Sequence, residues 1–191
     1  MPSSMPRPLQ ETDFPWLGER YSGKVRDSYV RDGKRILIAT DRLSAFDRVI
    51  TTVPGKGQVL TQLAKYWFER CASVVENHVL AVPDPCVMVG REVSIIPVEV
   101  VVRGYVAGSA WRDYIAGNAV SGVVLPAGLH EFQRLPRPIL TPSTKEAFGE
   151  HDVPISEQEI VSRGIVPASL WDRIRETALK LFDVGTKELE G

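Results

Sequence analysis

The sequence predicts an α+β fold, and three features support that class. Strand-like runs dominate the first half of the chain, whereas apolar residues at helical spacing dominate the second half. An Asp-Gly pair separates two strand-like runs near the start, as in an antiparallel hairpin. With 191 residues, 43% of them hydrophobic, the chain can build one domain or two small ones. Because strands and helices are segregated along the chain, we expect an α+β architecture.

The first half predicts a hairpin followed by a helix. Residues 1–15 begin with a proline-rich stretch that has no apolar run, so we expect a loose arm there. Strands over 21–30 and 35–40 flank the turn Arg31-Asp32-Gly33-Lys34, and a loop over 41–57 follows. A helix from about residue 58 to residue 73 is predicted by its apolar positions, which are Leu60, Leu63, Ala64, Trp67, Phe68 and Cys71.

The second half predicts two strands and then helices. Residues 87–89 and 93–102 are strand-like, and the second run is continuously apolar, as in a strand buried on both faces. A helix is expected to open at Ala107-Gly108-Ser109. The proline-rich stretch 126–154 lacks periodicity, which is typical of a functional or disordered loop. Two further helices are predicted, one opened by the capping-box spacing of Ser156 and Glu159 and one starting near Pro167.

Composition excludes several classes of function. A formal net charge of −1 gives no overall attraction to nucleic acid or to anionic membranes. No apolar run is long enough for a membrane span, and the N-terminus does not resemble a secretory signal. The two cysteines, Cys71 and Cys86, are too few for a disulfide framework and are expected to be buried, reduced thiols. We therefore expect a cytoplasmic protein that binds neither nucleic acid nor membrane.

Gly23-Lys24-Val25-Arg26 is the first candidate for a binding site. Lys24 and Arg26 alternate along the predicted strand, so both would face one side, and a glycine beside two cations suits a polyphosphate. A charged edge strand exposed to solvent explains the same residues and, on this segment alone, is the more frequent case.

Arg103 and the following Ala107-Gly108-Ser109 form the second candidate. An arginine at the end of a buried strand, close to a hydroxyl at a helix start, could converge on a phosphate. Alternatively Ser109 is a plain N-cap and Arg103 pairs with Glu99 or another carboxylate; the residues leave both interpretations open.

Two polar segments are weaker candidates. Residues 40–47 (Thr-Asp-Arg-Leu-Ser-Ala-Phe-Asp) place polar groups at the end of a strand, where sites collect. Residues 141–146 (Thr-Pro-Ser-Thr-Lys-Glu) offer hydroxyls and a lysine that could bind a carboxylate. Taken alone, both are better explained as local turns.

Together and in this order, these segments resemble the SAICAR synthetase (phosphoribosylaminoimidazole-succinocarboxamide synthase) family. The resemblance covers nearly the whole chain after the arm. It is carried by Gly23-Lys24-Val25-Arg26-Asp27, by residues 40–47, by Pro97-Val98-Glu99 with Arg103 and Ala107-Gly108-Ser109, and by Thr141-Pro142-Ser143-Thr144-Lys145.

The resemblance implies a ligase that uses ATP and Mg²⁺ to join L-aspartate to the carboxylate of carboxyaminoimidazole ribotide (CAIR), giving SAICAR in purine biosynthesis. It implies a kinase-like or ATP-grasp-like nucleotide lobe over residues 1–96, with an antiparallel sheet and a β-hairpin lid, and a central α+β lobe over 97–191. The implied ATP-binding residues are Gly23, Lys24, Arg26, Ile95 and Ile96. The implied substrate-binding residues are Ser44, Asp47, Arg103, Ser109 and Lys145.

One departure from the family pattern concerns the C-terminus. The family's later segments, including Asp-x-Lys-x-Glu-Phe-Gly, do not occur before Gly191. We therefore expect a chain without its C-terminal strands that cannot complete the reaction, and the sequence names no metal ligand or catalytic residue. The alternatives are an inactive fragment of this enzyme and a small-molecule kinase, the latter disfavoured because no His-Arg-Asp or Asp-Phe-Gly segment occurs.

Overall fold

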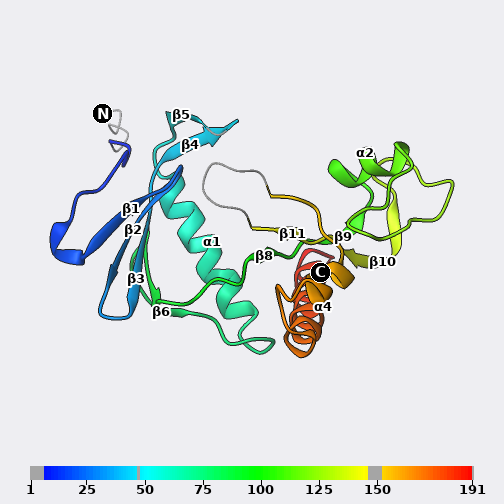
Figure 1. Cartoon of the computed structure of the whole chain (residues 1–191). Helices are drawn as coiled ribbons and strands as arrows, with labels where there is room; N and C mark the ends of the chain where they lie inside the picture. Colours follow the sequence, from blue (N-terminus) through cyan, green and yellow to red (C-terminus); the bar gives the residue numbers. More distant parts are fainter. Residues whose placement is uncertain (1–6, 47, 146–151, 191) are drawn as a thin grey trace. The chain divides into compact units, whose positions relative to one another are not determined.

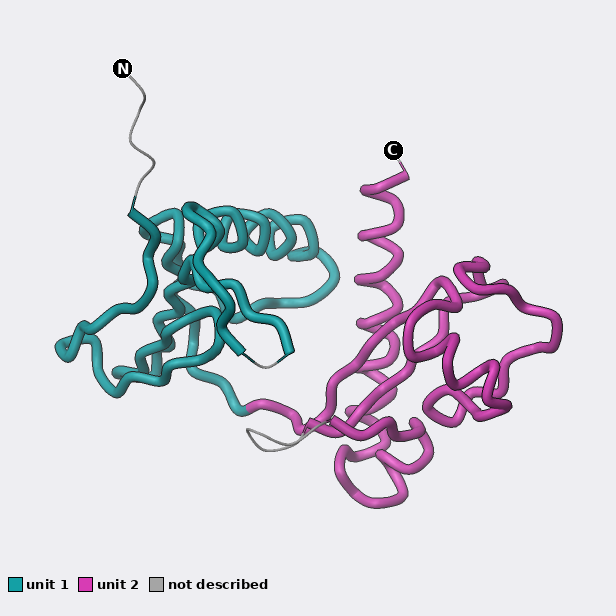
Figure 2. Tube along the Cα trace, turned by 90° about the horizontal axis from the view of Figure 1, so that it is seen from above, with its two compact units in different colours: residues 1–94 teal, residues 95–191 magenta. Residues whose placement is uncertain are grey.

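The computed structural model describes residues 7–46, 48–145 and 152–190 (Figure 1). The chain divides into two compact units, residues 1–94 and 95–191 (Figure 2). The architecture is α+β, as the segregation of strands and helices predicts. Each unit has its own sheets and helices.

Unit 1 is built on a five-stranded antiparallel sheet of order β1-β2-β3-β7-β6. Helix α1 packs against this sheet (Figure 1). A small separate hairpin, β4–β5, lies between β3 and α1 along the chain. The bounds are β1 Glu19–Ser22, β2 Arg26–Arg31, β3 Lys34–Ala39, β4 Arg42–Ala45, β5 Arg48–Thr52, α1 Lys56–Arg70, β6 Val79–Asp84 and β7 Val87–Arg91, with a 3-10 turn at Pro15–Leu17.

The predicted hairpin is confirmed as β2–β3. Arg31 pairs with Lys34 across the turn, and Asp32 and Gly33 both take positive φ angles, of 50° and 69°. Asp and Gly tolerate that backbone region, which two-residue hairpin turns need. The predicted helix is confirmed as α1, beginning two residues earlier than expected.

The expected loose arm is wrong for its described part, residues 7–14. Asp41 accepts a hydrogen bond from the Leu9 amide, Asp27 accepts one from the Thr12 amide, and the Tyr29 hydroxyl accepts one from the Phe14 amide. Thr12 is buried. These contacts join residues 15 to 32 positions apart, so the arm is docked by long-range bonds that local sequence does not display.

The arm and α1 cover opposite faces of the sheet. Side chains alternate along a strand, so Asp27 and Tyr29 of β2 point to one face, under the arm. Arg26 points to the other face, where it borders a cavity beside α1. Gly57 allows α1 to begin close to β3, because a Cβ there would lie 2.2 Å from the Ala39 carbonyl oxygen.

The described residues of unit 2 form two antiparallel strand pairs and three helices. Strand β10 pairs with β9, and β11 pairs with β8. Its larger core gathers Leu140, Ile155, Ile160, Val166 and Trp171, and a second cluster gathers Val106, Leu129 and Leu135. The bounds are β8 Val98–Glu99, β9 Val102–Tyr105, α2 Ser109–Ile115, β10 Arg134–Leu140, β11 Ser143–Thr144, α3 Glu157–Ser162 and α4 Ala168–Glu190.

The three predicted helices of this unit are confirmed, but the predicted strand over 93–102 is wrong. Ile95 is 70% exposed and Ile96 is 38% exposed, and only the two-residue β8 and the start of β9 fall in that range. Ser156 and Glu159 form the predicted capping box at the start of α3. The structure divides the chain between 94 and 95, two residues before the expected boundary at 96/97.

Five strands of the described structure were missed. The loop expected over 41–57 contains β4 and β5, the stretch expected to be irregular over 126–154 contains β10 and β11, and β6 was not predicted. Cys71 and Cys86 are free, as expected, but they are half-buried rather than buried. No helix in the described part of the chain is long and apolar enough to cross a membrane.

Candidate functional site

Arg103 and Ser109 lie together in unit 2. The guanidinium of Arg103, the second residue of β9, donates a hydrogen bond from Nη2 to the Ser109 hydroxyl over 3.0 Å. The contact is exposed, so a ligand can reach it. An arginine fork beside a hydroxyl is a strong arrangement for binding a phosphate or a carboxylate.

The structure contradicts two alternative explanations of these residues, the Glu99 pairing of Arg103 and the N-cap role of Ser109. Glu99 pairs with Lys145 rather than with Arg103. Gly108, with φ of 60°, is the N-cap of α2, and Ser109 is the first helical residue. Because α2 has only seven residues, its N-terminus is too short a helix end to count as an anion site, and the candidate site consists of the two side chains.

Thr141 also contacts Arg103, which the sequence did not predict. Its hydroxyl accepts a hydrogen bond from Arg103 Nε over 2.9 Å and donates one to the Val101 carbonyl over 3.3 Å. The two partners are 38 residues apart along the chain. The polar Thr-Pro-Ser-Thr-Lys segment was the available signal, but it did not indicate which hydroxyl meets Arg103.

Lys145 is held by Glu99 at the β8–β11 pair. Its ammonium group donates a hydrogen bond to a Glu99 carboxylate oxygen, and this bond raises the pKa of Lys145, whereas burial acts in the opposite direction. The lysine therefore carries a persistent positive charge, partly neutralised by its partner. Its contact with a substrate carboxylate stays a prediction.

In unit 1, Gly23, Lys24 and Val25 form the turn between β1 and β2, which we call the β1–β2 turn. The expectation that Lys24 and Arg26 share one face of a strand is wrong, because β2 begins only at Arg26. Both side chains are nevertheless exposed at the same end of the sheet.

The carbonyl groups of the β1–β2 turn accept hydrogen bonds from the side chains of Thr40 and Arg42. Arg42 donates to the Gly23 carbonyl over 2.8 Å and to the Lys24 carbonyl over 3.3 Å. The Thr40 hydroxyl donates to the Val25 carbonyl over 2.8 Å. Thr40 and Arg42 belong to a candidate segment of the sequence, and their observed contact is with the turn.

Asp27 holds the Arg42 guanidinium through a hydrogen-bonded ion pair. Its buried carboxylate accepts hydrogen bonds from Arg42, over 2.9 Å, and from Ser22 and Thr12. Burial would raise the pKa of Asp27, but the hydrogen bonds from Arg42, Thr12 and Ser22 outweigh it and hold that pKa below its ordinary value. The turn, the arm and β4 thus meet at one charged pair.

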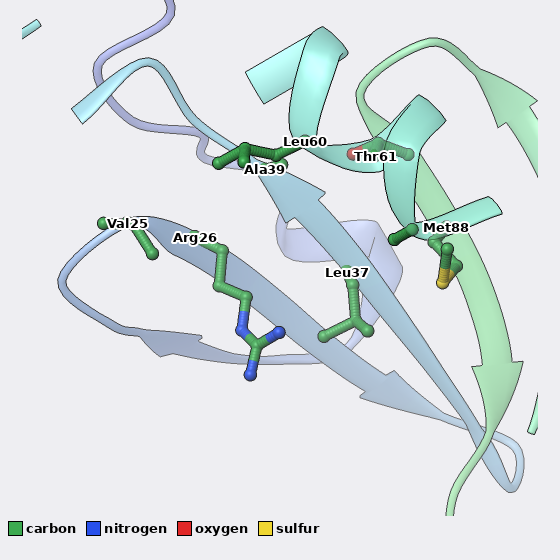
Figure 3. Close-up of a pocket in the computed structure, with 8 residues that line it drawn as sticks. Val25, Arg26, Leu37, Ala39, Leu60, Thr61 and Met88 are labelled. Atoms are coloured by element: carbon green, nitrogen blue, oxygen red, sulfur yellow. The ribbon is translucent and has the colours of Figure 1, made fainter. Parts of the chain in front are cut away.

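A small apolar cavity of about 150 Å³ lies between the sheet and α1 (Figure 3). Arg26 borders it, with its guanidinium directed away from the strand (Figure 3). The lining comes from the β1–β2 turn, β2, β3, β7 and α1 and consists of Val25, Arg26, Leu37, Ala39, Leu60, Thr61, Ala64 and Met88. An apolar surface beside a cation and a glycine turn suits a flat base carrying phosphates.

The remaining predicted residues are not gathered into either arrangement by a described contact. Ser44 is half-buried on β4, opposite Val49. Asp47 lies outside the described residues. Ile95 and Ile96 are exposed at the start of unit 2, and the Ile96 carbonyl accepts a hydrogen bond from the Val98 amide.

Within residues 7–46, 48–145 and 152–190, no group of three or more His, Cys, Asp or Glu side chains could hold a metal ion. No Mg²⁺ ligand is therefore assigned among the described residues.

Comparison with known proteins gives one consistent family. The family model described as SAICAR synthetase matches residues 19–190. A putative phosphoribosylaminoimidazole-succinocarboxamide synthase 2 of Mesorhizobium japonicum is 48% identical over 185 residues, which cover 94% of this chain and 59% of that protein. The chain thus spans about three fifths of the length of this curated relative.

Solved structures agree in fold. A SAICAR synthase from Saccharomyces cerevisiae complexed with SAICAR has a TM-score of 0.81 at 32% identity, covering 92% of this chain and 64% of that one. A type-2 SAICAR synthetase in complex with ADP has a TM-score of 0.74 at 28% identity, covering 90% of this chain and 69% of that one. On the family match and these likenesses, the chain belongs to the SAICAR synthetase family.

Proposed function

We propose that this chain carries the ribotide- and ATP-binding parts of an ATP-dependent ligase that joins L-aspartate to the carboxylate of CAIR. The observation that carries the proposal is the exposed Arg103–Ser109 pair, 3.0 Å apart, in a chain of this family. Arg103 and Ser109 would hold the 5′-phosphate of the ribotide. The SAICAR complex of the yeast relative supports a ligand of this kind.

The ATP part of the proposal rests on the first unit. The backbone of Ile95 and Ile96 would meet the adenine base, in a kinase-like lobe whose hairpin is the lid. Within unit 1, the apolar cavity beside Arg26 offers a surface that suits a nucleotide. Lys24 and Arg26 would face the phosphates, and Gly23 would let the backbone come close. The ADP complex of a relative supports nucleotide binding.

The chemistry fits residues that position ligands rather than attack them. A carboxylate is a poor electrophile, so its oxygen first attacks the γ-phosphorus of ATP, releasing ADP and leaving an acyl phosphate. The aspartate amine then attacks the acyl carbon, phosphate leaves, and the amine loses a proton as the amide forms. Phosphoryl transfer of this kind depends on orientation and on cationic charge.

Three substrate contacts complete the proposal. Ser44 and Asp47 would lie beside the imidazole ring, and Lys145 would approach a substrate carboxylate. Mg²⁺ would supply further positive charge to the phosphates, but the described residues hold no carboxylate cluster for it, so no step is assigned to the ion.

Isothermal titration with a matched ligand pair tests the phosphate assignment. Aminoimidazole carboxamide ribotide and its riboside differ only in the 5′-phosphate. Arg103→Met should weaken ribotide binding about tenfold to a hundredfold, the worth of a charged hydrogen bond, while leaving riboside binding unchanged. Arg137→Met, at an exposed arginine of β10, is the control and should change neither. Equal binding of the two ligands by the unaltered chain would contradict the assignment.

A further inference from the structure

Thr141 is buried directly behind the candidate phosphate site. Only 6% of it is exposed, and its hydroxyl lies between Arg103 Nε and the Val101 carbonyl. The hydroxyl proton is committed to Val101, which leaves an oxygen lone pair facing the Nε–H group. The hydroxyl therefore acts as a fixed acceptor for Arg103.

The backbone around Thr141 is held independently of this hydroxyl. The Thr141 amide donates to the Val101 carbonyl over 2.8 Å. Pro142 follows and restricts the backbone of Thr141 to extended conformations. The Pro142 carbonyl in turn accepts hydrogen bonds from the Ser121 hydroxyl and the Ile155 amide. Thr141 is thus a rigid anchor that should keep its place when the hydroxyl alone is removed.

The two contacts of Arg103 determine which part of the guanidinium faces a ligand. The group has five N–H donors in one plane. The Nε donor is used by Thr141 and one Nη2 donor by Ser109. The remaining donors, on Nη1 and Nη2, form the outer edge, which matches two oxygens of one phosphate.

We propose that Thr141 is a positioning residue for phosphate recognition, because its hydroxyl holds the Nε side of Arg103 and so presents the Nη1–Nη2 edge to the ligand. This inference rests on the proposed function, in which Arg103 meets the ribotide phosphate. Without the hydroxyl, the Nε–H group loses its acceptor and the guanidinium can rotate about its terminal bonds. Affinity for the phosphate is then lowered, whereas affinity for the rest of the ligand is unchanged.

The test compares ribotide and riboside affinities in the 191-residue chain and its variants by isothermal titration. Thr141→Val keeps the shape of the side chain and removes the hydroxyl, whereas Thr141→Ser keeps the hydroxyl. We expect Thr141→Val to weaken ribotide binding about tenfold and leave riboside binding unchanged, and Thr141→Ser to bind both ligands nearly as the parent does. Circular dichroism verifies that each variant is folded.

A double variant separates positioning from general support. If Thr141 acts through Arg103, adding Thr141→Val to Arg103→Met should cause no further loss of ribotide affinity. A Thr141→Val chain that is unfolded, or that loses both ligands equally, would show a structural role and overturn the inference.

The remaining outcomes distinguish the two proposals. Unchanged ribotide affinity in Thr141→Val, with the expected loss in Arg103→Met, would overturn the role of Thr141 and leave the proposed function standing. No preference for the ribotide in the parent chain would overturn both.

Discussion

Asp27 is the residue on which most of the contacts around the β1–β2 turn depend. Its carboxylate binds Arg42, Ser22 and Thr12, and Arg42 in turn holds the Gly23 and Lys24 carbonyls. In the sequence, Asp27 appeared only as the last residue of a motif. Its partners lie up to 15 residues away, and no local pattern indicates that an aspartate will be buried.

Replacing Asp27 by Asn should destabilise the fold by about 3–5 kcal/mol at pH 7, since Arg42 is left buried without its counter-charge. The folded pKa of Asp27 is lowered, so its stabilisation is complete above its ordinary value of about 3.9 and is lost as pH falls through the folded pKa. Urea unfolding of the parent and of Asp27→Asn should thus give free energies of unfolding that differ by a constant amount from pH 7 to about 5. The difference should become smaller in stronger acid.

Asp32→Asn is the matched control, because Asp32 is an exposed turn residue whose ion pair with Arg31 lies at the surface. Its effect should stay within about 0.5 kcal/mol. A difference for Asp27→Asn that persists unchanged into strong acid would contradict the charged pair.

Lys24 belongs to the same turn and is expected to contact ATP. Lys24→Ala should weaken ATP binding about tenfold to a hundredfold while leaving the unfolding transition unchanged. Lys34→Ala, at the far end of the β2–β3 hairpin, should leave ATP binding as it is. Titration calorimetry with ATP gives both values, and equal affinities for the two variants would remove Lys24 from the nucleotide site.

Among the elements, the ones predicted correctly have local signals and the ones missed do not. The β2–β3 hairpin follows from Asp32-Gly33, whose φ angles suit the turn, and α3 follows from its capping box. Strand β10 contains Pro136 and Pro138, which lack amide protons, and its pairing with β9 is interrupted between Arg134 and Ile139. A strand of this kind forms because other parts of unit 2 pack against it. Such packing cannot be predicted from local strand propensity.

The strand predicted over 93–102 failed for the opposite reason. A continuous apolar run favours a strand buried on both faces, but the run crosses the boundary between the two units. Ile95 and Ile96 are exposed there and are proposed to meet the adenine base. Apolar character predicted burial, although a nucleotide-binding surface has the same composition.

The start of α1 offers a test of packing at the element scale. Gly57→Ala would place a Cβ 2.2 Å from the Ala39 carbonyl oxygen, and backbone atoms cannot swing aside. We expect a loss of about 1–3 kcal/mol or more in unfolding free energy, measured by urea denaturation.

Gly185→Ala in α4 is the control for Gly57→Ala. A Cβ at position 185 would have no heavy atom within 4 Å beyond its own helix backbone and chain neighbours, and alanine favours the helix over glycine. The substitution should therefore raise the free energy of unfolding by about 0.5–1 kcal/mol. Equal effects of the two substitutions would show that α1 does not depend on this close approach to β3.

For the whole molecule, family and fold class could be predicted because the motifs occur in a fixed order, and the match over residues 19–190 confirms the family. The contacts inside the sites could not be predicted. The resemblance placed Arg103 and Ser109 in one substrate-binding site, but it did not indicate Thr141. Thr141 lies 38 residues from Arg103 along the chain and follows β10, which pairs with β9. The chain spans 59% of a curated relative, so the complete reaction remains a proposal.

A crystal structure of the chain with aminoimidazole carboxamide ribotide would test the central claim most directly. We predict that oxygens of the 5′-phosphate lie within hydrogen-bond distance, about 2.7–3.2 Å, of the Nη atoms of Arg103 and of the Ser109 hydroxyl. The Thr141 hydroxyl should still accept the Nε–H group of Arg103. A ribotide bound with its phosphate away from Arg103 and Ser109 would contradict the account.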